Sequence, residues 1–312
     1  MNKKDAKVIF MGTPKIASVI LKGIIEEGYN VVLVVTNPDK KVGRKGILTP
    51  SEVKVVALEN NIEVFQPISI KQDYQRIQEV EADILITCAY GQIVPMGVLN
   101  APKKGCINVH GSLLPHLRGA SPIQSALFEG LDETGVTIME MIDKMDAGRM
   151  FHKRIVKIEK EDNYTSLYDK IALAGKEALL ESLPKILSGE NQGEVQNEEE
   201  VTFCKKITPE EEHLSLASSN EEFINKVRGL SLTPGGYVLL DNKKLKIYAC
   251  KNYSSNVEVE VGRFIKKDKV TLLLQLEHGQ VEILSLQKEG KNIIDSRSFM
   301  NGERNLQELK VY

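Results

Sequence analysis

Short apolar runs alternate with stretches of helical periodicity through roughly the first 190 residues of the chain. The apolar runs predict buried strands, at residues 8–11, 31–36, 64–65, 84–88, 106–109 and 134–140. Apolar residues spaced three and four positions apart predict helices, over residues 16–27, 51–60, 74–79 and 165–187. Strands that alternate with helices are typical of βαβ units, so we expect an α/β fold with a doubly wound sheet.

The pattern changes in the last third of the chain. Polar residues with Gly189, Gly193 and an acidic run at 197–200 predict a connecting segment. A helix is predicted over residues 220–230, followed by short alternating strands, at residues 237–240, 244–249, 262–265, 270–276 and 281–286. Five short strands suit a small barrel. We therefore expect a first domain at residues 1–189, a linker at 190–207 and a second domain at 208–312.

Composition favours a globular protein of the cytoplasm. The 312 residues are 42% hydrophobic and 27% charged, which excludes disordered and fibrous classes. The charged N-terminus leads straight into the first predicted strand, and the longest apolar runs are too short to cross a bilayer. No CxxC spacing or histidine cluster occurs, so we expect reduced thiols and no metal site. The thiols belong to Cys88, Cys106, Cys204 and Cys250.

Candidate chemistry is concentrated in the segment 105–115. Asn108 and His110 stand two apart at the end of a predicted strand, which the turn signals Gly111 and Pro115 terminate. Because side chains alternate along a strand, both should point to the same side of the backbone. An amide can donate a hydrogen bond to a developing oxyanion, and an imidazole can move a proton near neutral pH. This pairing is suited to acyl transfer, although each residue alone is also common at strand ends.

Asp146 is the candidate third member of this group. It follows the predicted strand 134–140 and stands in a turn before Gly148. A carboxylate can orient an imidazole and stabilise its charged form. An aspartate in a turn before glycine is also frequent for purely structural reasons.

The turn Gly12-Thr13-Pro14 bears on the cofactor. It lacks the three glycines of a dinucleotide-binding loop, and Pro14 suits the first turn of the following helix. A dinucleotide cofactor is therefore not expected.

Asn108, His110, Asp146 and the run 112–115 together resemble the pattern of the folate-dependent formyltransferases. The resemblance extends over most of the chain, through residues 10–14, 36–39, 43–44, 89–95, 118–124, 163–167 and 167–170. It is weaker near the C-terminus, where residues 232–237 and 284–287 look like the small second domain of that family.

The resemblance implies a Rossmann-like formyltransferase domain followed by an OB-like β-barrel domain. It further implies that a formyl group moves from 10-formyltetrahydrofolate to the α-amine of methionyl initiator tRNA. In this reaction His110 is expected to handle a proton or donate to the oxyanion. Asn108 is expected to hold the oxyanion, and Asp146 to orient His110. The residues do not settle which group takes the first proton.

Binding residues follow from the same resemblance. The folate pocket is expected to include two loops, comprising Ser112, Leu113, Leu114 and Pro115, and Ala89, Tyr90, Gly91, Gln92 and Ile93. Core packing is the alternative for Leu113 and Leu114. The polar loop 36–50 is expected to meet tRNA through a basic cluster, comprising Lys40, Lys41, Arg44 and Lys45. A solvated surface loop is the alternative for that cluster.

Two other functions fit parts of this pattern. A formyltransferase that acts on a small amine, such as glycinamide ribonucleotide or an amino sugar nucleotide, could use the same three residues. A non-catalytic nucleotide- or RNA-binding protein would leave those residues unexplained. The net charge of −2 argues against nucleic-acid binding over the whole surface, although lysines and arginines gather near 243–251 and 263–269. We expect a monomer without a membrane partner.

Overall fold

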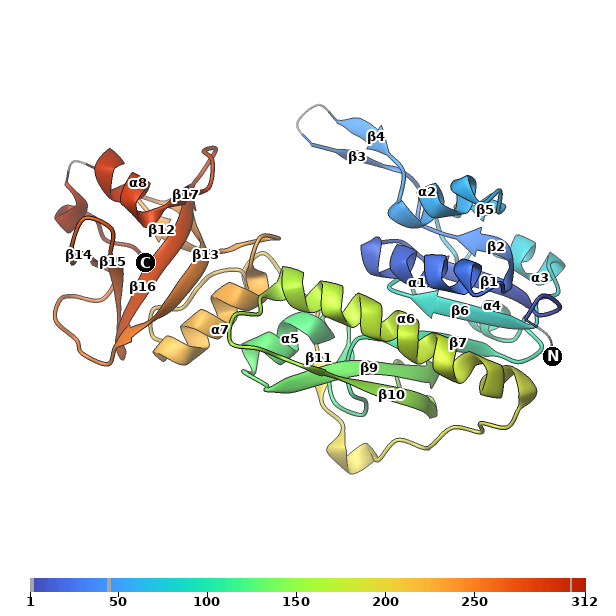
Figure 1. Cartoon of the computed structure of the whole chain (residues 1–312). Coiled ribbons are helices and arrows are strands. Elements are labelled where there is room, and N and C mark those ends of the chain that lie inside the picture. Colours follow the sequence, from blue (N-terminus) through green and yellow to red (C-terminus); the bar gives the residue numbers. More distant parts are fainter. Residues whose placement is uncertain (1–2, 44–45, 304) are drawn as a thin grey trace. The chain divides into compact units, whose positions relative to one another are not determined.

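The computed structural model describes residues 3–43, 46–303 and 305–312 (Figure 1). Its contacts divide the chain into two compact units that are interleaved along the sequence. The first unit comprises Met1–Gly119, Glu133–Lys157 and Tyr168–Cys204. The second comprises Ala120–Asp132, Ile158–Leu167 and Lys205–Tyr312. The domain boundaries expected from the sequence stay a prediction.

A seven-stranded sheet forms the centre of the first unit, in the order β10-β9-β7-β6-β1-β2-β5 (Figure 1). Its strands are β1 (Lys7–Gly12), β2 (Asn30–Val35), β5 (Val64–Phe65), β6 (Ile84–Cys88), β7 (Cys106–His110), β9 (Glu133–Glu140) and β10 (Met150–Lys157). The neighbouring strands β5, β2, β1, β6 and β7 all pair in parallel. At the β7 edge, β9 pairs antiparallel with β7, and β10 pairs antiparallel with β9. The predicted doubly wound α/β fold is confirmed.

Helices accompany these strands, and all of them except the short one at Met96–Leu99 were predicted from the periodicity. They are α1 (Lys15–Glu26), α2 (Glu52–Glu59), α3 (Gln75–Glu79), α4 (Met96–Leu99) and α6 (Tyr164–Ser188). In α1, Ile16, Ile20 and Ile24 are spaced by four and all are buried, so this face of the helix supplies part of the core.

The sheet changes winding direction between β1 and β6. From β1 the chain adds β2 and β5 on one side, and then places β6 and β7 on the other. Doubly wound sheets bind ligands outside the carboxyl ends of the strands at such a switch point. Gly12 ends β1 there, and a Cβ on this residue would lie 2.8 Å from the carbonyl oxygen of Cys88 at the end of β6. A glycine therefore permits the two strand ends to approach closely.

The segment that follows α6 packs as part of the first unit. Residues Phe203–Cys204 (β11) pair in parallel with Arg118–Gly119 (β8), and a 3-10 turn forms at η1 (Glu198–Glu200). The Met150 and Glu194 backbones also exchange two hydrogen bonds of 2.8 Å. The predicted connecting segment is thus tied to the first unit as far as residue 204.

A hairpin replaces the polar loop expected at residues 36–50. Its strands are β3 (Lys40–Val42) and β4 (Ile47–Thr49), which pair in antiparallel register (Figure 1). The sequence interpretation overlooked the short apolar stretches here. Val42, Ile47 and Leu48 remain 55–63% exposed, so they do not form a buried core.

The second unit contains a sheet of short antiparallel strands, as predicted. Its elements are α5 (Pro122–Phe128), α7 (Asn220–Leu230), β12 (Gly236–Leu240), β13 (Lys243–Ser254), β14 (Phe264–Lys266), β15 (Leu272–Leu276), β16 (Gly279–Lys288), β17 (Ile294–Asp295), α8 (Ser296–Gly302) and η2 (Leu306–Glu308). The order is β12-β13-β16-β15-β14, with β17 added to β16. The observed bounds of α7 are those predicted. In this unit α5, β17 and α8 were not among the predicted elements, and in the first unit β10 was not.

The last residues of the chain join the two edges of this sheet. Val311 bridges to Leu240 of β12, and Lys310 bridges to Arg263 beside β14. The side chain of Val311 is fully buried among the apolar side chains of the unit. The C-terminal residues therefore close the sheet into a barrel.

We expect the Val311→Ala substitution to destabilise the second unit by about 2 kcal/mol, because two buried methyl groups are removed. Chemical unfolding, followed with hydrogen exchange of β12 and β14, measures this effect. Val270→Ala is a matched control because Val270 is 57% exposed. Equal destabilisation by both substitutions would show that the C-terminal closure contributes little.

Candidate active site

Asn108 and His110 lie on β7, between the parallel strand β6 and the antiparallel strand β9. Asn108 is opposite Thr87 of β6, and His110 is opposite Thr137 of β9. The strand that the sequence predicts here is confirmed, and its alternation gives both side chains the same side of the backbone. His110 is 5% exposed, whereas Asn108 is half-buried.

Thr87 orients the amide of Asn108. The Thr87 hydroxyl lies 2.9 Å from Asn108 Oδ1, nearer than its other acceptors, Met141 Sδ at 3.0 Å and the Ile107 carbonyl at 3.3 Å. Donation to Oδ1 leaves the Nδ2 amino group of Asn108 available as a donor. An oriented N–H donor is the group needed to stabilise a developing oxyanion. Sequence reasoning missed Thr87, because its contact depends on the register of two strands rather than on a local motif.

His110 lies between a backbone carbonyl and a carboxylate. Its Nε2 is 3.0 Å from the carbonyl oxygen of Leu117. A carbonyl oxygen can only accept, so Nε2 carries the proton in this hydrogen bond. The other ring nitrogen, Nδ1, is 3.7 Å from Asp146 Oδ2. This distance exceeds that of a hydrogen bond but permits an electrostatic interaction with a protonated ring.

Asp146 is held by the backbone of a second segment. The amide N–H of Gly119 donates to Asp146 Oδ2 over 2.9 Å. Asp146 itself adopts φ 49°, a left-handed conformation that is uncommon for residues other than glycine. The structure thus brings Asn108, His110 and Asp146, the three predicted catalytic residues, into one region of the first unit.

A buried arginine, Arg118, and a glutamine, Gln196, form a hydrogen-bond network next to Asp146. Arg118 is fully buried, and its Nε and Nη2 donate to Gln196 Oε1 over 2.9 and 2.8 Å. Its Nη2 also donates to Glu198 Oε1 over 2.9 Å, and Glu198 pairs with Lys144 at 2.8 Å. The hydrogen bond from Arg118, and secondly that from Lys144, lowers the pKa of Glu198 to about 2.

The 112–115 run is largely committed to internal contacts. The Ser112 hydroxyl donates to the His116 carbonyl, and the Thr137 hydroxyl donates to the Ser112 carbonyl. Leu114 packs with Met139 and Met150 in a small apolar cluster. A ligand would therefore meet this run through its backbone or the half-buried Leu113 rather than through the side chain of Leu114.

Two side-chain amides shape the 89–95 loop. Asn37 Nδ2 donates to the Tyr90 carbonyl over 2.6 Å, and Gln92 Nε2 donates to Asn37 Oδ1 over 2.7 Å. Gln92 Oε1 accepts from the Ile70 amide, so the Gln92 side chain braces the loop. Tyr90 is buried, which raises its pKa to about 12. Ile93 is 91% exposed and is the apolar side chain of the loop that a ligand could cover.

The predicted tRNA-binding residues are only partly placed. Lys40 and Lys41 lie on the exposed strand β3. Arg44 and Lys45 lie outside the described residues. In the second unit, Lys251 pairs with Glu282 at 3.1 Å, so part of the positive charge predicted there is neutralised locally.

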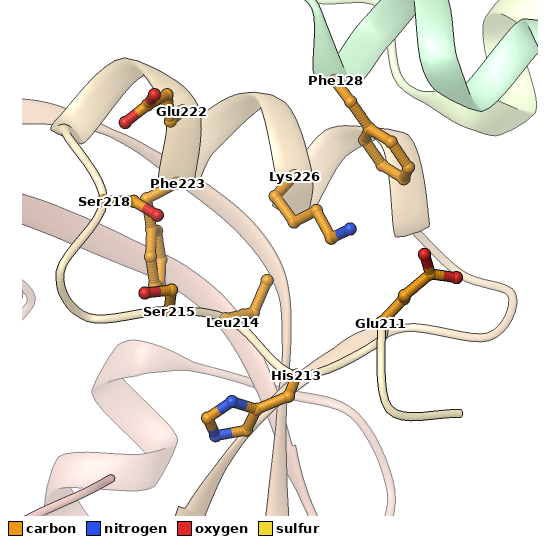
Figure 2. A pocket seen from close by; sticks show the side chains of 9 residues that line it. All are labelled: Phe128, Glu211, His213, Leu214, Ser215, Ser218, Glu222, Phe223 and Lys226. Atoms are coloured by element: carbon orange, nitrogen blue, oxygen red, sulfur yellow. The ribbon is translucent and has the colours of Figure 1, made fainter. Parts of the chain in front are cut away.

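A pocket of about 350 Å³ lies wholly within the second unit (Figure 2). Phe128, Lys226, His213 and Glu211 are among its lining residues. The Lys226 ammonium stands 4.2 Å from the centre of the Phe128 ring, and burial lowers its pKa. This pocket shares no residue with the catalytic candidates.

All four cysteines are free. Within the described residues there is no group of three or more His, Cys, Asp or Glu side chains able to hold a metal ion. No helix in that same part of the chain has the length and apolar character needed to span a membrane.

Two family models match the chain. The model described as formyl transferase matches residues 6–183, and the model of the formyl transferase C-terminal domain matches residues 206–304. The chain belongs to the formyl transferase family. It is 40% identical over 300 residues to a methionyl-tRNA formyltransferase of Lactobacillus gasseri, with 96% of each chain covered. It is 42% identical over 301 residues to the enzyme of that name from Macrococcus caseolyticus, again with 96% of each covered.

Solved structures share the fold at lower sequence identity. The sugar 3N-formyltransferase WlaRD, solved with dTDP and 5-N-formyl-THF, has a TM-score of 0.66 and 17% identity, covering 92% of this chain and 99% of its own. An N-formyltransferase from Helicobacter canadensis, in complex with folinic acid and dTDP-3-aminofucose, has a TM-score of 0.67 and 19% identity, with coverage of 91% and 99%.

The depressed pKa of Glu198 makes its contribution to stability dependent on pH. The folded state favours the ionised carboxylate, so the contribution is complete above the ordinary value of 4.5 and is lost as the pH falls toward 2. We expect Glu198→Gln to lower the free energy of unfolding at pH 7, with a difference from the parent that shrinks below about pH 4.5. Urea unfolding between pH 7 and pH 3 measures this. Glu199→Gln is the control, and a pH-independent difference would contradict the assignment.

Proposed function

We propose that the chain transfers a formyl group from 10-formyltetrahydrofolate to the α-amine of methionyl initiator tRNA, supplying formylmethionyl-tRNA for translation initiation. The observation that carries the chemistry is the contact of Thr87 with Asn108 Oδ1, which leaves Asn108 Nδ2 available as a donor, beside the pairing of His110 with Asp146. The substrate is supported by relatives about 40% identical to this chain over nearly its full length. The proposed compartment is the cytoplasm, and the proposed state is a monomer.

The residues suggest a division of roles. A free α-amine has a pKa of roughly 7.7 to 8.0, so a neutral fraction is available near pH 7 to attack the formyl carbon. Asn108 Nδ2 donates to the oxygen that becomes negative during this attack. His110 accepts or returns the proton that the attacking nitrogen loses, and Asp146 stabilises the charged imidazolium. The folate nitrogen then leaves with a proton, and the formyl group remains on the amine.

The binding surfaces are proposed on the same basis. Residues 89–93 and 112–115 form the proposed folate site, near the carboxyl ends of β6 and β7. Gly12, where β1 ends beside β6, permits the close approach of strand ends at this switch point. The exposed Ala89 and Ile93 are available to a ligand there. We propose tRNA contacts for Lys40, Lys41, Arg44 and Lys45.

We expect Asn108→Ala to lower turnover by roughly 10² to 10³, the usual effect of removing one oxyanion donor, while the melting temperature stays close to that of the parent. Steady-state formylation of charged initiator tRNA, with a melting curve for each variant, measures both. Asn100→Ala is the control, since Asn100 is exposed at the end of α4. Near-normal turnover would remove Asn108 from the mechanism.

The basic cluster of residues 40–45 allows a tRNA substrate to be distinguished from a small amine. We expect replacement of Lys40, Lys41, Arg44 and Lys45 by glutamine to raise the KM for charged tRNA and to reduce its salt dependence. The slope of log K against log salt should fall by about 0.7 to 0.9 for each phosphate that the variant no longer neutralises. Folate affinity should be unchanged.

The control for this experiment is the adjacent pair Lys103→Gln and Lys104→Gln. Equal salt slopes for the four-residue variant and the parent would indicate that this basic cluster is solvated and does not contact tRNA. Formylation of free amines or amino sugar nucleotides in preference to charged tRNA would support the small-amine alternative. Folate binding without any formyl transfer would support a non-catalytic protein.

A further inference from the structure

We propose that Gln196 is a positioning residue for formyl transfer, because it fixes the turn that carries Asp146 and so sets the approach of Asp146 to His110. This inference rests on the catalytic role proposed above for Asp146. Gln196 belongs to the segment that the sequence predicts as a linker.

The Gln196 amide uses its full hydrogen-bonding capacity within the first unit. Its Nε2 donates to the carbonyl oxygens of Asp146 and Gly148, both at 2.8 Å. Its Oε1 accepts twice from the guanidinium of Arg118. The residue is only 4% exposed. The Gln196 side chain donates two hydrogen bonds and accepts two. Only the side-chain amides of Asn and Gln can do both without carrying a charge.

The turn that Gln196 holds has little support of its own. Asp146 is in the left-handed region, and the Ala147 amide reaches the Lys144 carbonyl only at 3.4 Å. A Cβ on Gly148 would lie 2.0 Å from the Glu140 carbonyl oxygen, so the turn is pressed closely against the end of β9. The two hydrogen bonds from Gln196 therefore fix the backbone at Asp146 and, two residues later, at Gly148.

Through Arg118, Gln196 is also connected to the stretch that contacts His110. Arg118 stands between Leu117, whose carbonyl accepts from His110, and Gly119, whose amide donates to Asp146. Thr202, in the same segment as Gln196, fixes this stretch by accepting from the Leu117 and Arg118 amides at 2.8 and 2.9 Å. Gln196 thus joins the turn of Asp146 to the stretch that orients both catalytic side chains.

The test substitution is Gln196→Glu in the full-length protein. The carboxylate can still accept from Arg118, but it cannot donate to the two carbonyl oxygens of the turn. We expect kcat for formylation of charged tRNA to fall by about tenfold or more, as is usual when a reacting group is misplaced. The KM for tRNA and the affinity for folate should be unchanged. Gln192→Glu is the matched control, because Gln192 is exposed in the same segment.

A double-mutant cycle with Asp146→Asn separates positioning from general stabilisation. If Gln196 acts through Asp146, Gln196→Glu should cause almost no further loss of kcat in the Asp146→Asn background. The same fold-loss in both backgrounds would overturn the proposal, as would a parent-like kcat for Gln196→Glu. If Gln196→Glu does not fold, Gln196→Met, similar in size and uncharged, takes its place in the same cycle.

The outcomes also distinguish this proposal from the proposed function. Full activity of Asp146→Asn would contradict the catalytic role of Asp146 and the positioning role together. An inactive Asp146→Asn with a fully active Gln196→Glu would contradict only the positioning role. A lack of formyl transfer to tRNA by the parent, with transfer to a small amine, would leave the cycle measurable on that amine.

Discussion

The position of β7 between a parallel and an antiparallel neighbour is the constraint on which the site depends. Pairing with β6 places Thr87 beside Asn108 and so fixes the direction of its amide. Pairing with β9 places Thr137 opposite His110, and the chain beyond β9 then supplies Asp146. A one-residue slip of β7 would exchange its two faces and remove both side chains from the site.

The non-repetitive backbone around residues 117–119 also holds the candidate catalytic side chains. His110 and Asp146 are each held by main-chain groups of the 117–119 stretch, and that stretch is in turn held by the segment after α6. The charge of the buried Arg118 is met by Glu198, and its Nε and Nη2 donate to the amide oxygen of Gln196, whereas its Nη1 is buried without a hydrogen-bond partner among the described residues. The segment between α6 and residue 204 is therefore part of the catalytic architecture that we propose, as well as a connection.

The second unit has its own core and its own closure. Residues at the extreme C-terminus join the two edge strands, which satisfies backbone groups that an open sheet would leave exposed. Several of its basic side chains are engaged locally, as in the pairing of Lys251 with Glu282. The number of basic residues in this unit therefore overstates the positive charge that it presents.

The sequence by itself determined the strands and helices that follow from the spacing of apolar residues within a short stretch of chain. Apolar periodicity located β1, β6 and α7, and the period of two along β7 placed Asn108 and His110 on one side. Local motifs and family resemblance also selected Asp146. Only the tertiary structure places Thr87, Leu117 and Gln196 in contact with these residues. Gln196 is 50 positions from Asp146 and 78 from Arg118, and hydrogen bonds over such separations depend on chain folding that no local periodicity records.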